Sequence, residues 1–483
     1  MGLDSVGDLA LTIILTKLGP KETAKVSSVS KRFKDLASEE SLWSLFCLQD
    51  LDLSAPLDHH GNPLPSFKIV CQDVEFGMAT YKLWREAFCM YPWSLVKRVK
   101  SCWDRLKSWF TTNFPEVKAT LGRGASEGEI QELERILKVK LPLPTRLLYR
   151  FHDGQNLTGE NLNTDAADCL LGLIGGYSFY DHLVNVYLLP LHEVILETRE
   201  IVRHLDLPNG SQFIVVAASS SYIGKFFFLN CSDGQLYVGT QNLLTIGEMI
   251  PCVPQTLISP VHDFNIDQQQ DAMLLWLEEH GHRLHNGMIK LRDEENIKSI
   301  SLFPEESPLC STAVTNGVKV RASAIFVPEA VDLSRQYLFA YSIRMSLPPE
   351  GCIINGMRFS SCQLHLRHWV ISADDTVVSK VNSEAVIGKT SSQGPPVWPS
   401  RCNDWELLKG PTESQTYLLC LQFPLLLPGE KEFVYESCTP LQSPTGSVEG
   451  SFTFVPGRYS AWIHDILRVT LLSNLYRSRD CKS

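Results

Sequence analysis

The chain has 483 residues, of which 44% are hydrophobic and 20% are charged, and it carries a formal net charge of −10 at pH 7. These proportions exclude extensive disorder, and a length above about 300 residues predicts more than one domain. The negative charge argues against a protein that binds nucleic acid by neutralising its phosphates.

The cellular compartment follows from what the sequence lacks. It has no run of about 18 uninterrupted apolar residues, so no membrane span is predicted. Its opening residues do not show the basic-then-apolar order of an export signal. The 14 cysteines are scattered and include no CxxC pair, which favours free thiols in a reducing compartment. We therefore expect a cytoplasmic or nuclear protein, or one found in both places.

The first fifty residues are predicted to form short helices. Gly19-Pro20 ends one helix and starts the next. In the stretch VSSVSKRFKDLASEESLWSLF (26–46), apolar residues recur at steps of three and four, which places them on one helical face. The first helix has an apolar stripe of its own, formed by Leu11, Ile14, Leu15 and Leu18.

A second helical region is predicted between Tyr81 and Phe110, after a polar, proline-containing connection. This region is basic and rich in tryptophan. Its helical spacing and the acidic chain favour an inter-domain helix with a basic solvent face over a nucleic-acid site. Shortly after it, Ser126 and Glu129 have the spacing of a capping box at the start of a further helix.

Strands are predicted in two groups. The first group lies at 213–217, 225–229 and 235–239, and an amphipathic helix follows at about 268–280. Helices followed by such an antiparallel sheet are typical of an α+β domain. From about residue 310 the apolar residues alternate with a period of two, which indicates an all-β sandwich or barrel. Its predicted strands are 318–327, 337–345, 363–372 and 433–437.

Three stretches resemble known families. Residues 7 to 48 resemble an F-box, with Gly7-Asp8-Leu9 where the family usually has Leu-Pro. Residues 103 to 280 resemble a SUKH (SMI/KNR-like) domain through GRGASEGEIQELE and LPLPTRLLYRFHDGQ. Residues 310 to 457 resemble an ApaG domain through YLFAYSIRM and TGSVEGSFTF. Their order is similar to that of plant Skp-interacting F-box proteins.

The resemblance implies a multidomain chain. The expected parts are an α-helical F-box at 1–50, a helical linker region at 51–102, an α+β SUKH domain at 103–285, an all-β ApaG domain of the fibronectin-like sandwich type at 310–460, interrupted by an insertion at 390–421, and an atypical tail at 461–483.

The resemblance also implies a function, that of the substrate-recognition subunit of a Skp–cullin–F-box (SCF-type) E3 ubiquitin ligase. The F-box would dock a Skp-type adaptor and, through it, a cullin–RING ligase, while the SUKH and ApaG domains would recruit an unknown protein substrate. The chain would be non-catalytic, with no cofactor or metal and with neither nucleic acid nor a membrane as partner. The alternative is a small-ligand or polyphosphate-binding protein that acts through the ApaG domain.

Nine apolar residues are the expected adaptor contacts. Because the F-box helices form too small a unit to bury a full core, burying their apolar face in a partner would complete them. Trp43 is the expected anchor, since large aromatic residues at the centre of an interface contribute a disproportionate share of the binding energy. The alternative makes it part of an ordinary helical core. The expected contacts are Leu9, Ile14, Leu18, Pro20, Val26, Val29, Phe33, Leu42 and Trp43.

Two further motifs resemble phosphate loops and one group of histidines resembles a zinc site, but each departs from the pattern that such a site requires. SSSYIGKF (219–226) and SEAVIGKT (383–390) place Gly-Lys as a phosphate loop does, but both begin with Ser and run through strand-like sequence. His280, His282 and His285 lie close together, yet no Cys or carboxylate completes a tetrahedral zinc site at the expected spacing. We interpret the three histidines as a solvated helix end.

Three segments depart from the family pattern: 69–80, 390–421 and the residues after Gly457. We hypothesise that they derive from retained introns or alternative splicing. On that hypothesis the sandwich lacks its closing strand and presents an exposed edge that favours aggregation.

Overall fold

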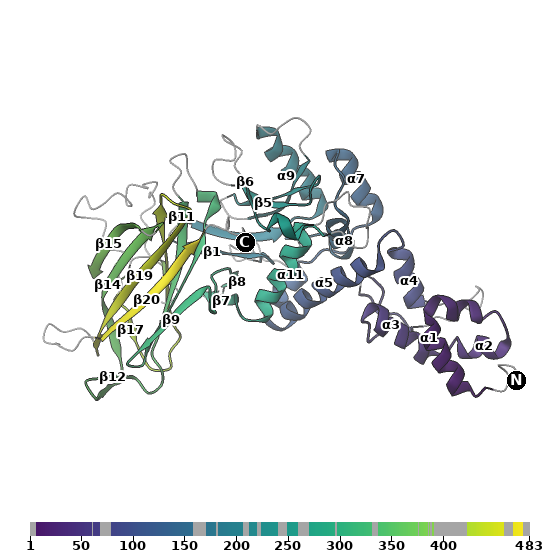
Figure 1. The fold of residues 1–483 in the computed structure, drawn as a ribbon, viewed down its shortest axis with the longest axis horizontal. Coiled ribbons are helices and arrows are strands. Elements are labelled where there is room, and N and C mark those ends of the chain that lie inside the picture. The colour runs from purple at the N-terminus through teal and green to yellow at the C-terminus, as the bar shows by residue number, and fades with distance from the viewer. Residues whose placement is uncertain are drawn as a thin grey trace.

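The protein is elongated, with a helical unit at its N-terminal end, an α+β domain in the middle and a β-sandwich at the other end (Figure 1). This arrangement confirms the multidomain fold class expected from the sequence. The computed structural model describes residues 6–59, 61–67, 79–157, 171–179, 182–205, 212–219, 224–239, 249–258, 270–294, 297–330, 337–374, 376–384, 386, 389–390, 423–457 and 467–476.

The N-terminal unit contains three helices. The first is kinked at Gly19, whose φ of 80° is readily adopted by glycine, and Pro20 starts its second segment. Ser30 caps the second helix by accepting a hydrogen bond from the backbone N–H of Phe33. The helices are α1 (Asp8–Val26), α2 (Lys31–Leu36) and α3 (Glu40–Leu51).

Helices α4 (Ala79–Ala87) and α5 (Trp93–Asn113) connect this unit to the α+β domain. The ammonium group of Lys97 donates to the carbonyl oxygen of Gln49, near the C-terminal end of α3, at 3.0 Å. Further along α5, the indole N–H of Trp103 donates to the carbonyl of Leu148 at 3.2 Å. The predicted inter-domain helix is therefore confirmed, although Lys97 contacts the protein instead of forming a purely solvated basic face.

Helix α7 of the α+β domain begins with a capping box. In α7, Ser126 Oγ accepts from the backbone of Glu129 at 3.2 Å, and the carboxylate of Glu129 accepts from the backbone of Ser126 at 2.6 Å. The predicted capping box is thus confirmed. The helices are α6 (Pro115–Ala119), α7 (Glu127–Leu137), α8 (Leu143–Phe151), α9 (Leu191–His204) and α11 (Ala272–His285), with a 3₁₀ turn η3 (Gln255–Leu257).

The described strands of this domain form one sheet in the order β6-β5-β4-β3-β2-β1-β8-β7. The three predicted strands are confirmed as β3, β4 and β5. The sheet also extends beyond residue 285, the predicted end of the domain, because β1 pairs with β8 at Gly176 and Ser301. The strands are β1 (Gly175–Phe179), β2 (His182–Leu188), β3 (Phe213–Ser219), β4 (Phe226–Asn230), β5 (Leu236–Gly239), β6 (Met249–Pro251), β7 (Lys290–Glu294) and β8 (Ile297–Ser301).

The C-terminal domain is a sandwich, as predicted. One sheet has the order β16-β18-β11-β10-β9 and the other β15-β14-β19-β20, with β17 paired to β14 and a separate β12–β13 hairpin. Its elements are β9 (Cys310–Thr315), β10 (Val318–Phe326), the 3₁₀ turn η5 (Pro328–Ala330), β11 (Tyr337–Ser346), β12 (Cys352–Ile354), β13 (Met357–Phe359), β14 (Cys362–Ala373), β15 (Thr376–Glu384), β16 (Lys389–Thr390), β17 (Leu425–Leu426), β18 (Phe433–Leu441), β19 (Thr445–Pro456) and β20 (Leu467–Tyr476).

The expectation that the sandwich lacks its closing strand is wrong. β20 pairs with β19 along its whole length, from Leu467 opposite Phe454 to Tyr476 opposite Thr445. Strand pairing uses backbone groups, so a segment can close the sheet without the family's side-chain pattern. The departures at 69–80 and 390–421 lie almost entirely outside the described residues.

A single hydrophobic core links the N-terminal unit to the α+β domain. Buried residues of α1, α3, α4, α5 and β8 belong to one contiguous cluster, for example Leu11, Trp43, Trp84, Trp103 and Ile300. The inside of the sandwich holds a second cluster, which includes Trp369 and Phe452. No helix in the described part of the chain is both long and apolar enough to cross a membrane.

Candidate functional site

Helix α1 exposes large apolar side chains on its outer surface. Leu11 and Leu15 point into the core and are each 1% exposed, whereas other apolar residues of the same helix remain in solvent. The exposed fractions are 79% for Leu9, 54% for Ile13, 44% for Ile14 and 46% for Leu18. We call these four residues the α1 face. Residues four apart lie together on a helix, so the pairs 9/13 and 14/18 form two exposed rows, which are about 140° apart around the axis of α1.

A charged contact holds α2 against the start of α1. The guanidinium of Arg32 donates to the carboxylate of Asp8 through Nε at 2.9 Å and Nη2 at 2.6 Å. Its Nη2 also donates to the carbonyl of Val6 at 2.5 Å. This contact keeps the turn before α2, where Val29 is 70% exposed, fixed relative to the N-terminal end of α1.

The expected anchor does not lie at the surface. Trp43 and Leu42 are each 2% exposed. The indole N–H of Trp43 donates to the carbonyl of Ala37 at 2.8 Å, and its ring contacts Phe46 at 5.3 Å and Tyr81 at 6.0 Å between centroids. The structure therefore contradicts direct adaptor contact by Leu42 and Trp43, because the chain's own helices already cover both side chains.

The remaining predicted contacts lie between these extremes. Pro20, Val26 and Phe33 are half-buried at the edge of the helical unit. Sequence reasoning missed Ile13, although it lies four residues after Leu9 on the same helical face. Of the nine predicted residues, the structure leaves Leu9, Ile14 and Leu18 exposed on α1 and Val29 exposed on the turn before α2.

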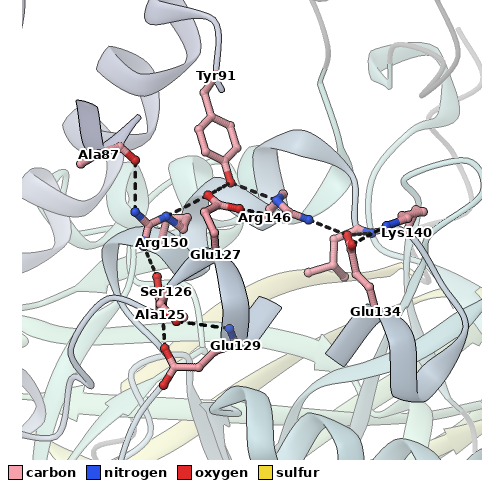
Figure 2. A network of polar contacts seen from close by, with 11 residues as sticks. Ala87, Tyr91, Ala125, Ser126, Glu127, Glu129, Glu134, Lys140, Arg146 and Arg150 are labelled. Carbon is pink, nitrogen blue, oxygen red and sulfur yellow. Dashed lines mark hydrogen bonds and ion pairs between the residues drawn. The ribbon is translucent and has the colours of Figure 1, made fainter. Parts of the chain in front are cut away.

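The joint between α4, α5 and the α+β domain contains a buried polar network (Figure 2). Arg146 of α8 contacts Glu127 at 2.6 Å and Glu134 at 2.7 Å, and the phenol of Tyr91 donates to Glu127 at 2.7 Å. Burial and the hydrogen bond to Glu127 raise the pKa of the Tyr91 phenol. Arg150 also donates to the carbonyl of Ala87 at 3.1 Å. Each group is matched to a partner, so the network serves as a structural joint.

The interpretation of His280 as part of a solvated helix end is wrong. This histidine is 4% exposed. Its Nε2 donates to the carbonyl of Leu173 at 2.9 Å, and its ring stacks on Trp276 at 5.5 Å. Burial lowers the pKa of His280 to about 4. His282 and His285 lie on the same helix, and the described part of the chain contains no cluster of three metal-ligating residues.

The first of the two phosphate-loop-like motifs also has a structural explanation. Lys225 of the 219–226 motif is 6% exposed and lies 3.3 Å from the carboxylate of Glu329. Its charge is therefore already balanced within the protein. The 383–390 motif lies along β15 and β16, with residues 385, 387 and 388 outside the described residues.

Two family models match the chain. The F-box domain matches residues 5–45. The ApaG domain matches residues 329–394 and 412–456, so the match is interrupted within the predicted insertion.

Three relatives extend these matches. F-box protein SKIP16 of Arabidopsis thaliana is 55% identical over 95% of this chain and 94% of its own length. F-box only protein 3 of Homo sapiens is 22% identical over 94% of this chain and 79% of its own. The KNR4/SMI1 homolog 2 of Debaryomyces hansenii is 33% identical over 16% of this chain and 13% of its own, which supports the SUKH domain.

These full-length likenesses to F-box proteins favour a ligase subunit over a polyphosphate-binding protein. The α1 face lies within the matched F-box, and the helices, sheet and sandwich follow in the expected order. The chain belongs to the family of F-box proteins that carry an F-box, a SUKH and an ApaG domain in that order, and it is a substrate-recognition subunit of a Skp–cullin–F-box ubiquitin ligase.

Proposed function

We propose that the α1 face is the surface through which the chain docks its Skp-type adaptor. The observation that carries the proposal is the exposure of four large apolar side chains on one helix, beside a core that is otherwise closed. Large apolar side chains that gather in solvent on one element mark a protein-interaction site. An amphipathic helix that lays its apolar residues into a groove is a recurrent mode of recognition.

The nine expected adaptor contacts then have different roles. Leu9, Ile14 and Leu18 contact the adaptor together with Ile13, and Val29 extends the contact across the turn before α2. Pro20, Val26 and Phe33 line its edge. Leu42 and Trp43 stabilise α1 from within the core that they share with it. Burying one fully exposed Leu or Ile contributes roughly 1.5–3 kcal/mol, and the residues of the α1 face, which are 44–79% exposed, each offer a part of that.

The SUKH and ApaG domains recruit the protein to be ubiquitinated, and the chain itself performs no bond chemistry. Its contribution to the rate is proximity, because holding a target lysine near the charged conjugating enzyme raises the effective concentration of the two reactants. The docked adaptor connects the chain to the cullin–RING ligase.

The test replaces two adjoining residues of the α1 face, Ile14→Asp together with Leu18→Asp, in the full-length chain. Placing two carboxylates in an apolar contact should weaken binding to a purified Skp-type adaptor by about 100-fold or more. Isothermal titration calorimetry measures the affinity, and thermal unfolding monitored by circular dichroism checks the fold. Because both side chains are only partly exposed, at 44% and 46%, we expect the unfolding temperature to fall moderately while the fold is retained.

A matched control is available on another helix. Leu196 of α9 is 62% exposed, so Leu196→Asp introduces a carboxylate of the same kind, one where the test variant has two, at an exposed helical site outside the F-box. This variant should bind the adaptor as the unmodified chain does. Equal binding by the control and by the double variant would exclude the α1 face as the docking surface.

A further inference from the structure

One glutamate of the sandwich domain is buried against the α+β domain. Glu329 lies in η5, between β10 and β11, and its side chain is 2% exposed. The phenol of Tyr177 donates to its Oε1 at 2.5 Å, and His182 Nε2 lies 2.9 Å from the same oxygen. Lys225 Nζ lies 3.3 Å from Oε2 and donates to the phenol of Tyr177 at 2.6 Å. Three segments of the α+β domain thus converge on one carboxylate.

The carboxylate of Glu329 stays ionised in this environment. Burial opposes ionisation, but the charge of Lys225 and the contact with His182 outweigh it and lower the pKa of Glu329 to about 2. The buried ammonium of Lys225 also lies 4.7 Å from the centroid of the Tyr177 ring. Removing one partner of a buried ion pair leaves the other charge uncompensated, which is strongly unfavourable.

The same interface also contains buried apolar residues of the sandwich. Val327, Leu338 and Ala340 are each at most 2% exposed and belong to the core cluster of the α+β domain, although they lie in the sandwich. At the level of whole elements, η5 contacts β5 and β18 contacts β1. The interface therefore has an apolar centre, with Glu329 at one side of it.

Two other polar contacts cross the same interface. Arg292 of β7 pairs with Glu436 of β18 and donates to the hydroxyl of Ser342 on β11 at 2.9 Å. Glu305 lies 2.7 Å from Arg344 of β11. Each contact joins the end of the α+β domain to the outer surface of the β18-β11-β10 sheet.

We propose that Glu329 is a positioning residue that locks the ApaG domain onto the SUKH sheet, so that the two domains form one rigid receptor. Domains within a chain move relative to each other unless their interface is large and apolar, and here a buried ion pair fixes the orientation of a modest apolar contact. The lock also determines which lysines lie within reach of the conjugating enzyme. This second role rests on the proposed ligase function.

The experiment compares three full-length variants. Glu329→Gln keeps the shape but leaves Lys225 buried without its counter-charge. Lys225→Met combined with Glu329→Gln removes both charges, so it tests the lock in a variant without an unpaired buried group. Glu306→Gln is the control. Glu306 is 58% exposed, and its long contact, at 3.9 Å from Lys290, contributes little.

The first readout is amide hydrogen exchange in residues 327–330 and 337–340. Glu329→Gln should exchange at least about tenfold faster there, because the interface opens more often. The double variant should be less affected than Glu329→Gln, and the control should match the unmodified chain. Unchanged exchange in Glu329→Gln would overturn the proposal, as would a double variant that is protected as well as the unmodified chain, because it lacks the ion pair too.

The second readout is the pattern of self-ubiquitination in the reconstituted ligase, mapped by peptide mass spectrometry. In Glu329→Gln the ubiquitin should spread over more lysines of the chain than in the unmodified protein. A pattern identical to that of the unmodified chain would contradict the positioning role even if exchange were faster. Failure of the unmodified chain to bind the adaptor would refute the proposed docking function instead, and the exchange readout would still decide the lock.

Discussion

The N-terminal helical unit and the central α+β domain differ in where they place apolar and charged side chains. The helical unit leaves apolar residues in water, with Leu9 and Ile13 more than half exposed on α1. The central domain buries charged residues, with Glu134 and Arg146 in contact at 2.7 Å beneath the surface. Exposed apolar surface gains free energy when another protein covers it, whereas a matched buried ion pair gains nothing from a partner. The difference separates a surface adapted for docking from a joint adapted for rigidity.

The largest expected effect in this comparison is that of Arg146→Ala. The substitution leaves Glu127 and Glu134 partly buried without their shared cation, and breaking such a pair costs about 3 kcal/mol. Arg150 and Lys140 still contact the two glutamates, so the loss should fall at the lower end of the usual range. Urea unfolding measures the free energy of unfolding.

An exposed ion pair on the neighbouring helix provides the matched control for Arg146→Ala. Arg135 contacts Glu132 at 2.6 Å, but both side chains are at least half exposed. Such pairs contribute at most about 1 kcal/mol, so Arg135→Ala should change the stability by less than that. Equal effects of the two arginine variants would show that the joint is not a rigid, desolvated network.

The next largest effect is the loss of folding stability that the buried His280 should cause on acidification. Its folded pKa of about 4 lies below the ordinary value of 6.5, so on acidification the unfolded chain binds a proton before the folded one does. The contribution of neutral His280 to the free energy of unfolding is therefore complete above pH 6.5 and is lost as the pH falls toward 4. Between pH 7.5 and pH 5 the loss from this group should be about 2 kcal/mol.

Unfolding free energies measured at both pH values, for the unmodified chain and for His280→Gln, test this prediction. The variant should lose less stability on acidification, whereas His282→Gln, at a neighbouring exposed position, should behave as the unmodified chain does. An identical pH dependence in His280→Gln would show that this buried histidine does not contribute to the acid sensitivity.

The smallest expected effect is that of Trp43→Phe. The substitution removes the indole N–H and leaves the carbonyl of the buried Ala37 without its donor, which costs about 1–2 kcal/mol. Because Trp43 is covered by its own chain, adaptor affinity should change much less than in the variant of the α1 face. A 100-fold loss of affinity at unchanged stability would restore Trp43 as a direct anchor.

Local features of this fold could be predicted from the sequence. The kink at Gly19 and the capping box at Ser126 depend on residues within four positions, and both are present. A continuous apolar run also identified β3 correctly, and the alternation of apolar residues identified β11 and β14.

Contacts between distant segments could not be predicted in the same way. The sequence predicts Trp43 as an interface residue because Tyr81, which covers it, belongs to a separate helix, α4. His280 reads as solvated because Leu173, whose carbonyl it contacts, lies 107 positions earlier. Tyr177 and Glu329 are 152 positions apart. Periodicity shows that a residue faces inward or outward along its own element, but not what another element later places over it.

Helix α5 belongs to two parts of the molecule at once, since Lys97 contacts the end of α3 and Trp103 contacts α8. Its 21 residues make it about 30 Å long. It therefore sets the spacing between the N-terminal unit and the α+β domain. One extra residue in its middle would lengthen the arm by about 1.5 Å and swing everything beyond it by about 100° around the axis. The relative orientation of these two parts thus depends on the residue count of a single helix.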